Sequence, residues 1–467
     1  MDLTGLALRA AAGRPHVLLA TLPGGTAARL EAERALRLRD WPLAATPAQA
    51  DVLLVVGPDR PDLHAAVARL WQDLPAPRAR VHARGAEDVE AALGTGQARL
   101  SSLAGQQAEA PGGATQGGDT GSPHHQDSRC GEEQGETNGD ADGSHDEHDG
   151  GGGGHHHDAD AQHGDEQAGS HERHEGHEGH DGEDDHSKGH GGHGGHGGGD
   201  MEMPGGLPMA EQGEDRDGLM LDQLHVPLGP LLADWPAGLT IHVTLQGDLV
   251  QEAEVEEPLR HDTAAAEAFW VQPWLRAAGG EPVVVGEAAR RRAAAHLDSL
   301  ARLLSVAGWP AEAIVARRLR DDLLDGAPGV AVAPRLARLD RRVSRSRTLA
   351  WLTRGIGQVS AEVARETGVS GPAARADGDV TDRYRQWLAD IRRDVGQMEQ
   401  PSPMRLAVDE SPRGWWRNDR PPSSALIALL PGLLNGVELA AARLIVASLD
   451  PDLDELPVVR SEVGACG

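Results

Sequence analysis

Short apolar runs alternate with helical stretches in the first hundred residues. The runs His16–Ala20 and Asp51–Gly57 are almost continuously apolar, as expected of buried strands. Each precedes a stretch, Thr26–Asp40 or Pro61–Leu74, in which apolar residues return at helical spacing. Strands that alternate with helices favour a parallel sheet. The sequence therefore predicts a small α/β domain over residues 1–104.

The turn Pro23-Gly24-Gly25 joins the first predicted strand to the first predicted helix. A glycine-rich turn at this place can bind phosphate, but neither G-x-G-x-x-G nor G-x-x-x-x-G-K-[ST] is present. We therefore interpret it as an ordinary strand-to-helix turn.

The C-terminal block, residues 219–467, has a different pattern. Residues 239–256 alternate apolar and polar positions about Gln246-Gly247-Asp248, which predicts a β-hairpin. Helical periodicity then dominates. The block is predicted to be mainly α-helical, with a small antiparallel sheet at its entrance. The predicted helices are 287–306, 310–324, 335–353, 378–395 and 423–449.

Residues 105–218 show no apolar periodicity and are rich in Gly, Asp, Glu, His and Gln. They contain 28 acidic and 4 basic residues, so most of the formal net charge of −29 belongs to them. Such a composition cannot bury enough apolar surface to offset the entropy of ordering the chain. We predict a long disordered linker between two domains of nearly neutral charge.

Cysteine content and charge exclude several classes of protein. The two cysteines, Cys130 and Cys466, are too few for a disulfide-stapled scaffold or a cysteine-ligated iron–sulfur protein. The acidic balance argues against a nucleic-acid partner.

The start of the chain lacks an export signal, which predicts a cytoplasmic location. The most apolar later run, 425–449, is interrupted by Pro431, Asn435, Glu438 and Arg443, which are costly in hydrocarbon. We expect a buried helix there, and membrane association only through partners, as a peripheral protein on the inner face.

Histidines are the most evident candidate ligands. Of the 23 histidines, 16 lie in the predicted linker, many at every third position. Imidazole nitrogens bind nickel and zinc, and neighbouring acids attract cations. The alternative is a solvated low-complexity spacer. The candidate metal ligands are His155, His156, His157, His163, His171, His174, His177, His180, His186, His190, His193 and His196.

Several short stretches, in order and with suitable spacing, resemble the large subunit of the complex I and membrane-bound nickel–iron hydrogenase family. They span most of residues 225–456, beginning around Pro227–Ala253. Residues 51–81 are similar to the small, cluster-bearing subunit of the same complexes. The resemblance thus implies a small and a large subunit fused through the linker. Its later stretches are Thr353–Gly357, Gly368–Pro372, Arg375–Gly378, Val408–Gly414, Arg420–Ser423, Leu433–Ala440 and Ala447–Pro451.

The chain departs from the family where redox centres are bound. The small subunit holds its cluster with four thiolates, yet Pro23-Gly24-Gly25 stands where its first cysteines would be, and residues 1–104 contain no cysteine. In hydrogenases a C-terminal C-x-x-C pair binds nickel and iron. That pair would fall in Asp450–Glu455, and Cys466 lies too far along to replace it. Hydrogen activation is therefore not expected.

Complex I large subunits use a histidine and a tyrosine in a quinone pocket. Tyr384 and His261 match these roles poorly, so no quinone ligand is assigned and quinone binding stays unknown. The acids Asp450, Asp452, Asp454 and Glu455 could hold a hard cation, but we favour an exposed acidic tail.

These observations predict a degenerate subunit resembling those of NADH-quinone oxidoreductase and hydrogenase. It would be a structural or regulatory component of a membrane-associated redox complex, and its partners would be complex I-like or hydrogenase-like subunits. The resemblance is to oxidoreductases, but the missing cysteines leave enzymatic activity undecided. The alternative is a nickel- or zinc-binding reservoir or chaperone for a hydrogenase-type client.

Overall fold

A computed structural model describes residues 12–102, 211–214, 220–257, 268–416 and 420–456. All of these residues belong to one compact unit, formed by 1–117 and 207–467. We call residues 12–102 the N-terminal region and residues 211–456 the C-terminal region. The first is a mixed α/β region with a parallel sheet, and the second is mainly helical with a small antiparallel sheet, so the predicted fold class is confirmed.

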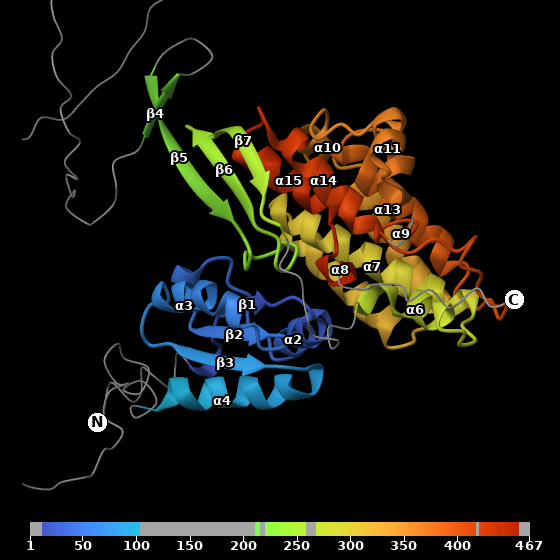
Figure 1. The fold of residues 1–467 in the computed structure, drawn as a ribbon. Coiled ribbons are helices and arrows are strands. Elements are labelled where there is room, and N and C mark those ends of the chain that lie inside the picture. Colours follow the sequence, from blue (N-terminus) through green and yellow to red (C-terminus); the bar gives the residue numbers. More distant parts are fainter. Residues whose placement is uncertain (1–11, 103–210, 215–219, 258–267, 417–419, 457–467) are drawn as a thin grey trace, which may run out of the picture. The chain divides into compact units, whose positions relative to one another are not determined.

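The N-terminal region is a three-stranded parallel sheet in the order β1-β2-β3, with helices on both faces (Figure 1). Every side chain of β2 is buried, as its apolar sequence predicts for a central strand. Helices α2 and α4 pack on one face of the sheet, and α3 packs on the other. Its elements are β1 (Val17–Thr21), α2 (Thr26–Leu38), η1 (Pro47–Gln49), β2 (Val52–Val56), η2 (Pro61–Leu63), α3 (His64–Gln72), β3 (Ala79–Ala83), η3 (Ala86–Asp88) and α4 (Val89–Ser101).

Strand β3 and helix α4 were not predicted individually. In β3 the buried Ala79, Val81 and Ala83 alternate with the exposed Arg80 and His82. An edge strand with polar residues on one side gives a weaker apolar pattern than a central strand.

The sheet of the C-terminal region is antiparallel, in the order β4-β5-β6-β7. The predicted hairpin is confirmed as β6 and β7, with Gly247 at φ +62° in its turn. Strand β5 was not predicted, because most of its side chains are exposed and its pattern is weak. The strands are β4 (Glu211–Glu214), β5 (Met220–Leu228), β6 (Ile241–Gln246) and β7 (Leu249–Val255).

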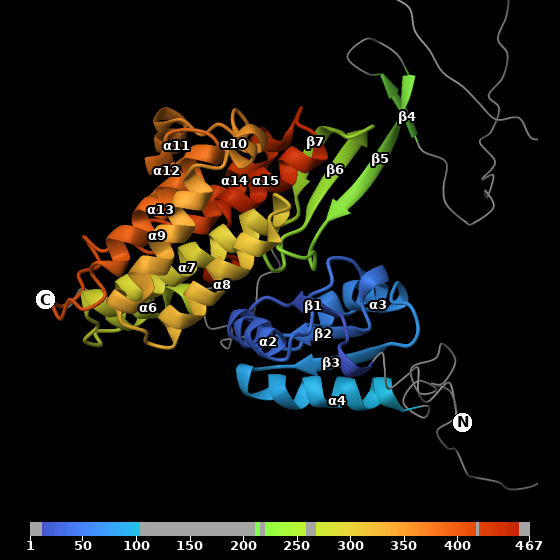
Figure 2. The same ribbon diagram turned by 180° about the vertical axis from the view of Figure 1, so that it is seen from behind.

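The helices of the C-terminal region pack around α7, which contacts α8, α13 and α15 (Figures 1 and 2). Helix α7 is buried on most sides, and its sequence is correspondingly rich in Ala and Leu. The helices are η4 (Phe269–Val271), α6 (Gln272–Ala278), α7 (Val285–Val306), α8 (Pro310–Leu324), α9 (Gly329–Ser344), α10 (Arg347–Thr353), α11 (Ala361–Thr367), α12 (Gly371–Ala376), α13 (Val380–Val395), α14 (Pro422–Leu434), α15 (Leu439–Leu449) and η5 (Leu453–Glu455).

Two predicted helices are each broken in two. The first, 335–353, is divided into α9 and α10 at Ser346, whose hydroxyl caps α10 by accepting a hydrogen bond from the Leu349 amide at 3.2 Å. The second, 423–449, is divided into α14 and α15 at Gly436, which has φ +79°. The Gly436 amide donates a hydrogen bond to the Val250 carbonyl of β7 at 2.7 Å. Pairing with the sheet edge therefore interrupts an otherwise helical sequence.

Almost all of the predicted linker lies outside the described residues. The exception is Glu211–Glu214, which forms β4 and pairs with β5, so the predicted disorder was wrong for these four residues. Among the described residues, no helix is both long and apolar enough to cross a membrane.

Candidate functional site

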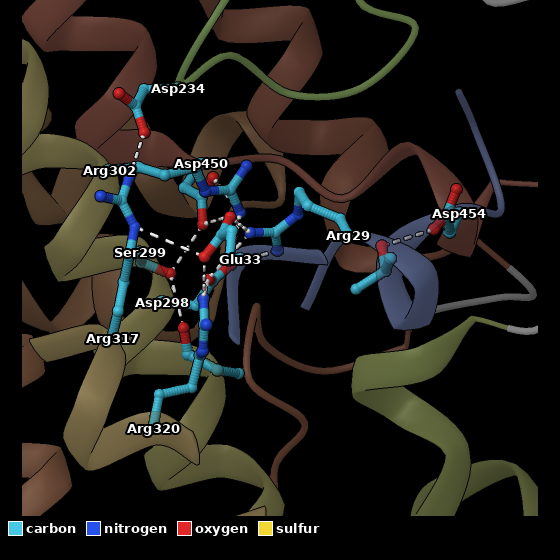
Figure 3. Close-up of polar contacts among 12 residues, drawn as sticks. Arg29, Glu33, Asp234, Asp298, Ser299, Arg302, Arg317, Arg320, Asp450 and Asp454 are labelled. Atoms are coloured by element: carbon cyan, nitrogen blue, oxygen red, sulfur yellow. Dashed lines mark hydrogen bonds and ion pairs between the residues drawn. The ribbon is translucent and has the colours of Figure 1, made fainter. Parts of the chain in front are cut away.

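Helix α2 is the part of the N-terminal region that reaches the charged core of the molecule. Arg29 and Glu33 lie one helical turn apart, so both face the same way, and Arg29 Nη1 is 2.7 Å from Glu33 Oε1. Both side chains point toward α7 and α8 (Figure 3). A basic and an acidic side chain thus extend from one region into the other.

Asp298 of α7 and Arg320 of α8 receive these two side chains. Arg29 Nη2 lies 2.7 Å from Asp298 Oδ2, and Arg320 Nη1 lies 2.6 Å from Asp298 Oδ1. Arg320 Nη1 is also 2.8 Å from Glu33 Oε2. The Arg320 side chain has 0% exposure. The two carboxylates and two guanidinium groups therefore bridge one another across the regions.

The network of ion pairs continues to Asp450, the residue that follows α15. Arg302 Nη2 is 2.8 Å from Asp450 Oδ1, and Arg413 Nη2 is 2.6 Å from Asp450 Oδ2. Ser299 donates its hydroxyl to the same carboxylate at 2.6 Å. Asp450 has φ +43°, a left-handed conformation that aspartate tolerates better than most residues. We call the following residues the ion-pair cluster: Arg29, Glu33, Asp298, Arg302, Arg317, Arg320, Arg413 and Asp450.

Electrostatics in the cluster favour the charged forms. Burial alone would raise the pKa of Glu33, but Arg320, Arg29 and Arg317 outweigh burial and lower it to about 2. Burial would also raise the pKa of Asp298, but Arg29, Arg302 and Arg320 hold it well below its ordinary value. The cluster is therefore fully charged near neutral pH and is suited to fastening the regions rather than to proton transfer.

The acidic segment, residues 450–455, is where the exposed-tail prediction was wrong. Asp450, Asp454 and Glu455 are buried, and Asp452 is partly buried. The segment turns inward because Leu453 joins the main hydrophobic core and Asp450 is held by arginines. Sequence inspection could not place it inside, since the partners of these acids are distant along the chain.

Asp454 binds the glycine turn of the N-terminal region directly. Its Oδ1 accepts a hydrogen bond from the Gly24 amide at 2.6 Å, and its Oδ2 accepts one from the Thr26 hydroxyl at 3.0 Å. Glu455 instead accepts hydrogen bonds from the hydroxyl and the amide of Ser423, at 2.7 and 3.3 Å. Asp454 is thus a second contact between the regions, independent of the ion-pair cluster.

Burial first, and the neighbouring Asp452 charge second, raise the pKa of Asp454 to about 7 and that of Glu455 to about 8. Burial also raises the pKa of Asp452. Of the described residues, none forms an ion pair with Asp452, Asp454 or Glu455. Asp454 and Glu455 therefore hold protons near neutral pH, in contrast to the ion-pair cluster beside them, to which Asp450 belongs.

A cavity of about 790 Å³ lies between α2, the loop 230–237, α7, α8 and the acidic segment. Leu43, Leu232 and Ile314 contribute exposed apolar side chains to its lining. Arg302 Nε and Asp452 Oδ2 lie in the polar part and have no hydrogen-bond partner among the described residues. The cavity can therefore accommodate a molecule with a polar end and an apolar body.

The glycine turn allows a test of this arrangement. A Cβ at Gly25 would lie 2.6 Å from the Val56 carbonyl oxygen and 2.7 Å from the Leu22 carbonyl oxygen, both backbone atoms that cannot yield. We expect Gly25→Ala to lower the free energy of unfolding by about 1–3 kcal/mol, because the turn must shift away from Asp454. Urea unfolding measures the loss.

The matched control is Gly94→Ala in α4, where a Cβ meets nothing within 4 Å. Alanine favours helix there, so we expect a gain of up to about 1 kcal/mol. If the two substitutions changed the free energy of unfolding equally, the close backbone contacts of Gly25 would not be important for stability.

The structure does not bring together the residues that the sequence singled out. All twelve candidate histidines, and His261, lie outside the described residues. Tyr384 is fully buried in α13. In the described ranges, no group of three or more His, Cys, Asp or Glu side chains is arranged to hold a metal ion. Of the predicted acids, only the four of the acidic segment lie at the site.

Sequence reasoning missed the arginines and the acids of α2, α7 and α8. No motif marks them, but two signals were present: Arg29 with Glu33 and Asp298 with Arg302 are each four residues apart. Asp298 also stands in a run of α7 that is otherwise rich in Ala and Leu, where a charge needs a partner.

Comparisons with known proteins give little beyond this geometry. No protein family model matches the sequence, and no curated protein matches it. Among solved structures, one similar chain comes from the membrane-bound sulfane sulfur reductase (MBS), an archaeal respiratory membrane complex. The match has a TM-score of 0.35 and 16% identity, and it covers 50% of this chain and 98% of that chain.

Proposed function

We propose that this protein is a structural or regulatory subunit of a membrane-associated redox complex, with no redox centre of its own. Its folded regions would supply docking surfaces for complex I-like or hydrogenase-like subunits, and it would reach the membrane through them. The proposal builds on the sequence resemblance over residues 225–456.

One observation supports the proposal most strongly. The resemblance aligns Pro23-Gly24-Gly25 with the cluster cysteines of the small subunit, and the acidic segment with the metal-binding cysteines of the large subunit. In this chain the two segments are hydrogen-bonded to each other, through the Gly24 amide and the Asp454 carboxyl at 2.6 Å. The segments that would hold metal centres thus form a direct contact between the regions.

The side chains at these positions do not fit the metal centres of the family. An iron–sulfur cluster needs thiolates, and the residues near the turn are glycines, Thr26 and carboxyls already engaged in hydrogen bonds. The ion-pair cluster next to them consists of guanidinium and carboxylate groups that bind one another and offers no thiolate. This arrangement favours a fastening role over electron transfer.

The test is purification from the native host in mild detergent, followed by identification of the bound proteins and measurement of iron, nickel and zinc. The full chain should be compared with a variant that lacks residues 120–200. We expect redox-complex subunits to accompany both forms, and we expect neither form to contain iron in stoichiometric amounts.

The competing proposal, a metal reservoir or chaperone that uses the histidine-rich stretch, makes the opposite prediction. In that case the full chain would be isolated without redox-complex subunits and loaded with nickel or zinc, and the deletion would remove the metal. That result would overturn the subunit proposal.

A further inference from the structure

Asp452, Asp454 and Glu455 of the acidic segment differ from the other buried acids at this site in what surrounds them. Glu33 and Asp298 each contact several guanidinium groups, whereas the hydrogen bonds of Asp454 and Glu455 within the described part of the chain come from amides and hydroxyls. Glu455 has 0% exposure. Two oxygens, Asp452 Oδ2 and Glu455 Oε1, have no hydrogen-bond partner within the described ranges. A buried carboxylate without a counter-charge is costly, and a bound proton removes that cost.

The carboxyls of Asp452, Asp454 and Glu455 also influence one another. The Asp454 amide donates a hydrogen bond to Asp452 Oδ1 at 3.1 Å, and the Asp452 amide donates one to the Ser423 hydroxyl oxygen at 2.9 Å. The charge of Asp452 raises the pKa of both Asp454 and Glu455. Each proton lost from the segment therefore places a negative charge beside other buried acids.

Asp454 is the member of this group that touches the N-terminal region. Its two hydrogen bonds reach the first residues of α2 and the turn before it, at Gly24 and Thr26. Repulsion inside the acidic segment can thus be transmitted to the contact between the regions.

We propose that the acidic segment is a proton-sensitive latch, in which protonated Asp454 and Glu455 hold the glycine turn against the C-terminal region and loss of their protons loosens it. This inference goes beyond the proposed function, because it does not depend on which complex the protein joins.

Charged groups on the surrounding elements influence the pH at which the carboxyls of the latch lose their protons. Arg29 on α2 favours ionised Asp454, while Arg413, in the loop before α14, favours ionised Asp452 and Glu455. Arg302 on α7 also favours ionised Asp452, and Asp450 opposes it. The hydrogen bonds that Gly24 and Thr26 donate to Asp454, and those that Ser423 donates to Glu455, also favour the ionised forms. Burial and the Asp452 charge outweigh these hydrogen bonds and the arginines.

The direction of the pH effect follows from the raised pKa values. A carboxyl whose folded pKa exceeds its unfolded pKa stabilises the fold fully below about pH 4, and this stabilisation is lost as the pH rises through its folded pKa. For the latch that loss extends up to about pH 7 to 8. Glu33 has a lowered pKa, so its contribution to stability is lost in acid, as the pH falls and its carboxylate becomes protonated. It does not change between pH 6 and pH 8. The contact should therefore loosen between about pH 6 and pH 8.

Hydrogen–deuterium exchange of the full chain tests the latch. After correction for the intrinsic exchange rate, we expect amide protection in peptides covering residues 24–30 and 450–456 to fall about tenfold between pH 6 and pH 8. A double variant, Asp454→Asn with Glu455→Gln, keeps the size and one acceptor oxygen of each side chain but cannot ionise. It should show the same protection at both pH values.

The control variant is Asp40→Asn, which removes a carboxyl that lines the same cavity but has a side-chain exposure of 84%. It should retain the wild-type pH dependence. Infrared spectroscopy of the wild-type chain gives a readout that does not depend on any variant folding. It should show buried protonated carboxyl groups at pH 6 that disappear between about pH 7 and pH 8. Unchanged wild-type protection between pH 6 and pH 8, or carboxyls already ionised at pH 6, would overturn the proposal.

Discussion

Arg320→Met is expected to lower the free energy of unfolding by about 3–5 kcal/mol, because it removes one partner from a buried ion-pair network. Arg320 has no exposed side-chain surface, and it contacts both Glu33 of the N-terminal region and Asp298 of the C-terminal region. Methionine fills similar space, but each of the two buried carboxylates loses one of its guanidinium contacts. Chemical denaturation of the full chain measures the loss.

The control for Arg320 is Arg34→Met. Arg34 also joins the regions, with Nη1 2.6 Å from Asp325 Oδ1, but both side chains are well exposed. Exposed pairs contribute about 0–1 kcal/mol, so this substitution should have little effect. A small effect at both positions would mean that the buried cluster does not fasten the regions.

Asp450→Ala is the second substitution with a large expected effect, again about 3–5 kcal/mol. It leaves Arg413, which is buried, and Arg302 without their shared carboxylate. It also places alanine at φ +43°, which adds about 1–2 kcal/mol of backbone strain. The fall in melting temperature should accordingly be among the largest for any single alanine in the C-terminal region.

Asp450→Asn separates the two causes. Asparagine tolerates the left-handed conformation and keeps an acceptor for Ser299, but it has no charge for the arginines. We expect a smaller loss than for alanine, about 1–3 kcal/mol. If asparagine and alanine are equally damaging, the charge accounts for the whole effect. If asparagine is harmless, the backbone conformation at position 450 accounts for the whole effect of alanine.

The fold class could be predicted because it depends on local patterns. The continuous apolar runs of β1 and β2, and the helical periodicity of α2, α7 and α8, were sufficient. The prediction failed where distant contacts decide the local structure. Gly436 ends a helix because it pairs with Val250, and that pairing has no local signature.

The candidate site could not be predicted in the same way. The sequence directed attention to histidines, which lie outside the described residues, and to the acidic segment, which it placed at the surface. Whether Asp450 is exposed depends on Arg302 and Arg413, and nothing near the acid in sequence indicates these partners. The absence of cysteine from residues 1–104 could be read from the sequence, but the contact between Gly24 and Asp454 could not.

Charged side chains of α2 and α7 meet between the N-terminal and C-terminal regions, and we expect their attraction to fasten the regions together. A double-mutant cycle on Arg29→Met and Asp298→Asn tests it most directly, since these side chains meet at 2.7 Å across the regions. We expect the two substitutions to be coupled by at least about 1 kcal/mol in the free energy of unfolding. Additivity within about 0.5 kcal/mol would mean that this pair does not hold the regions together.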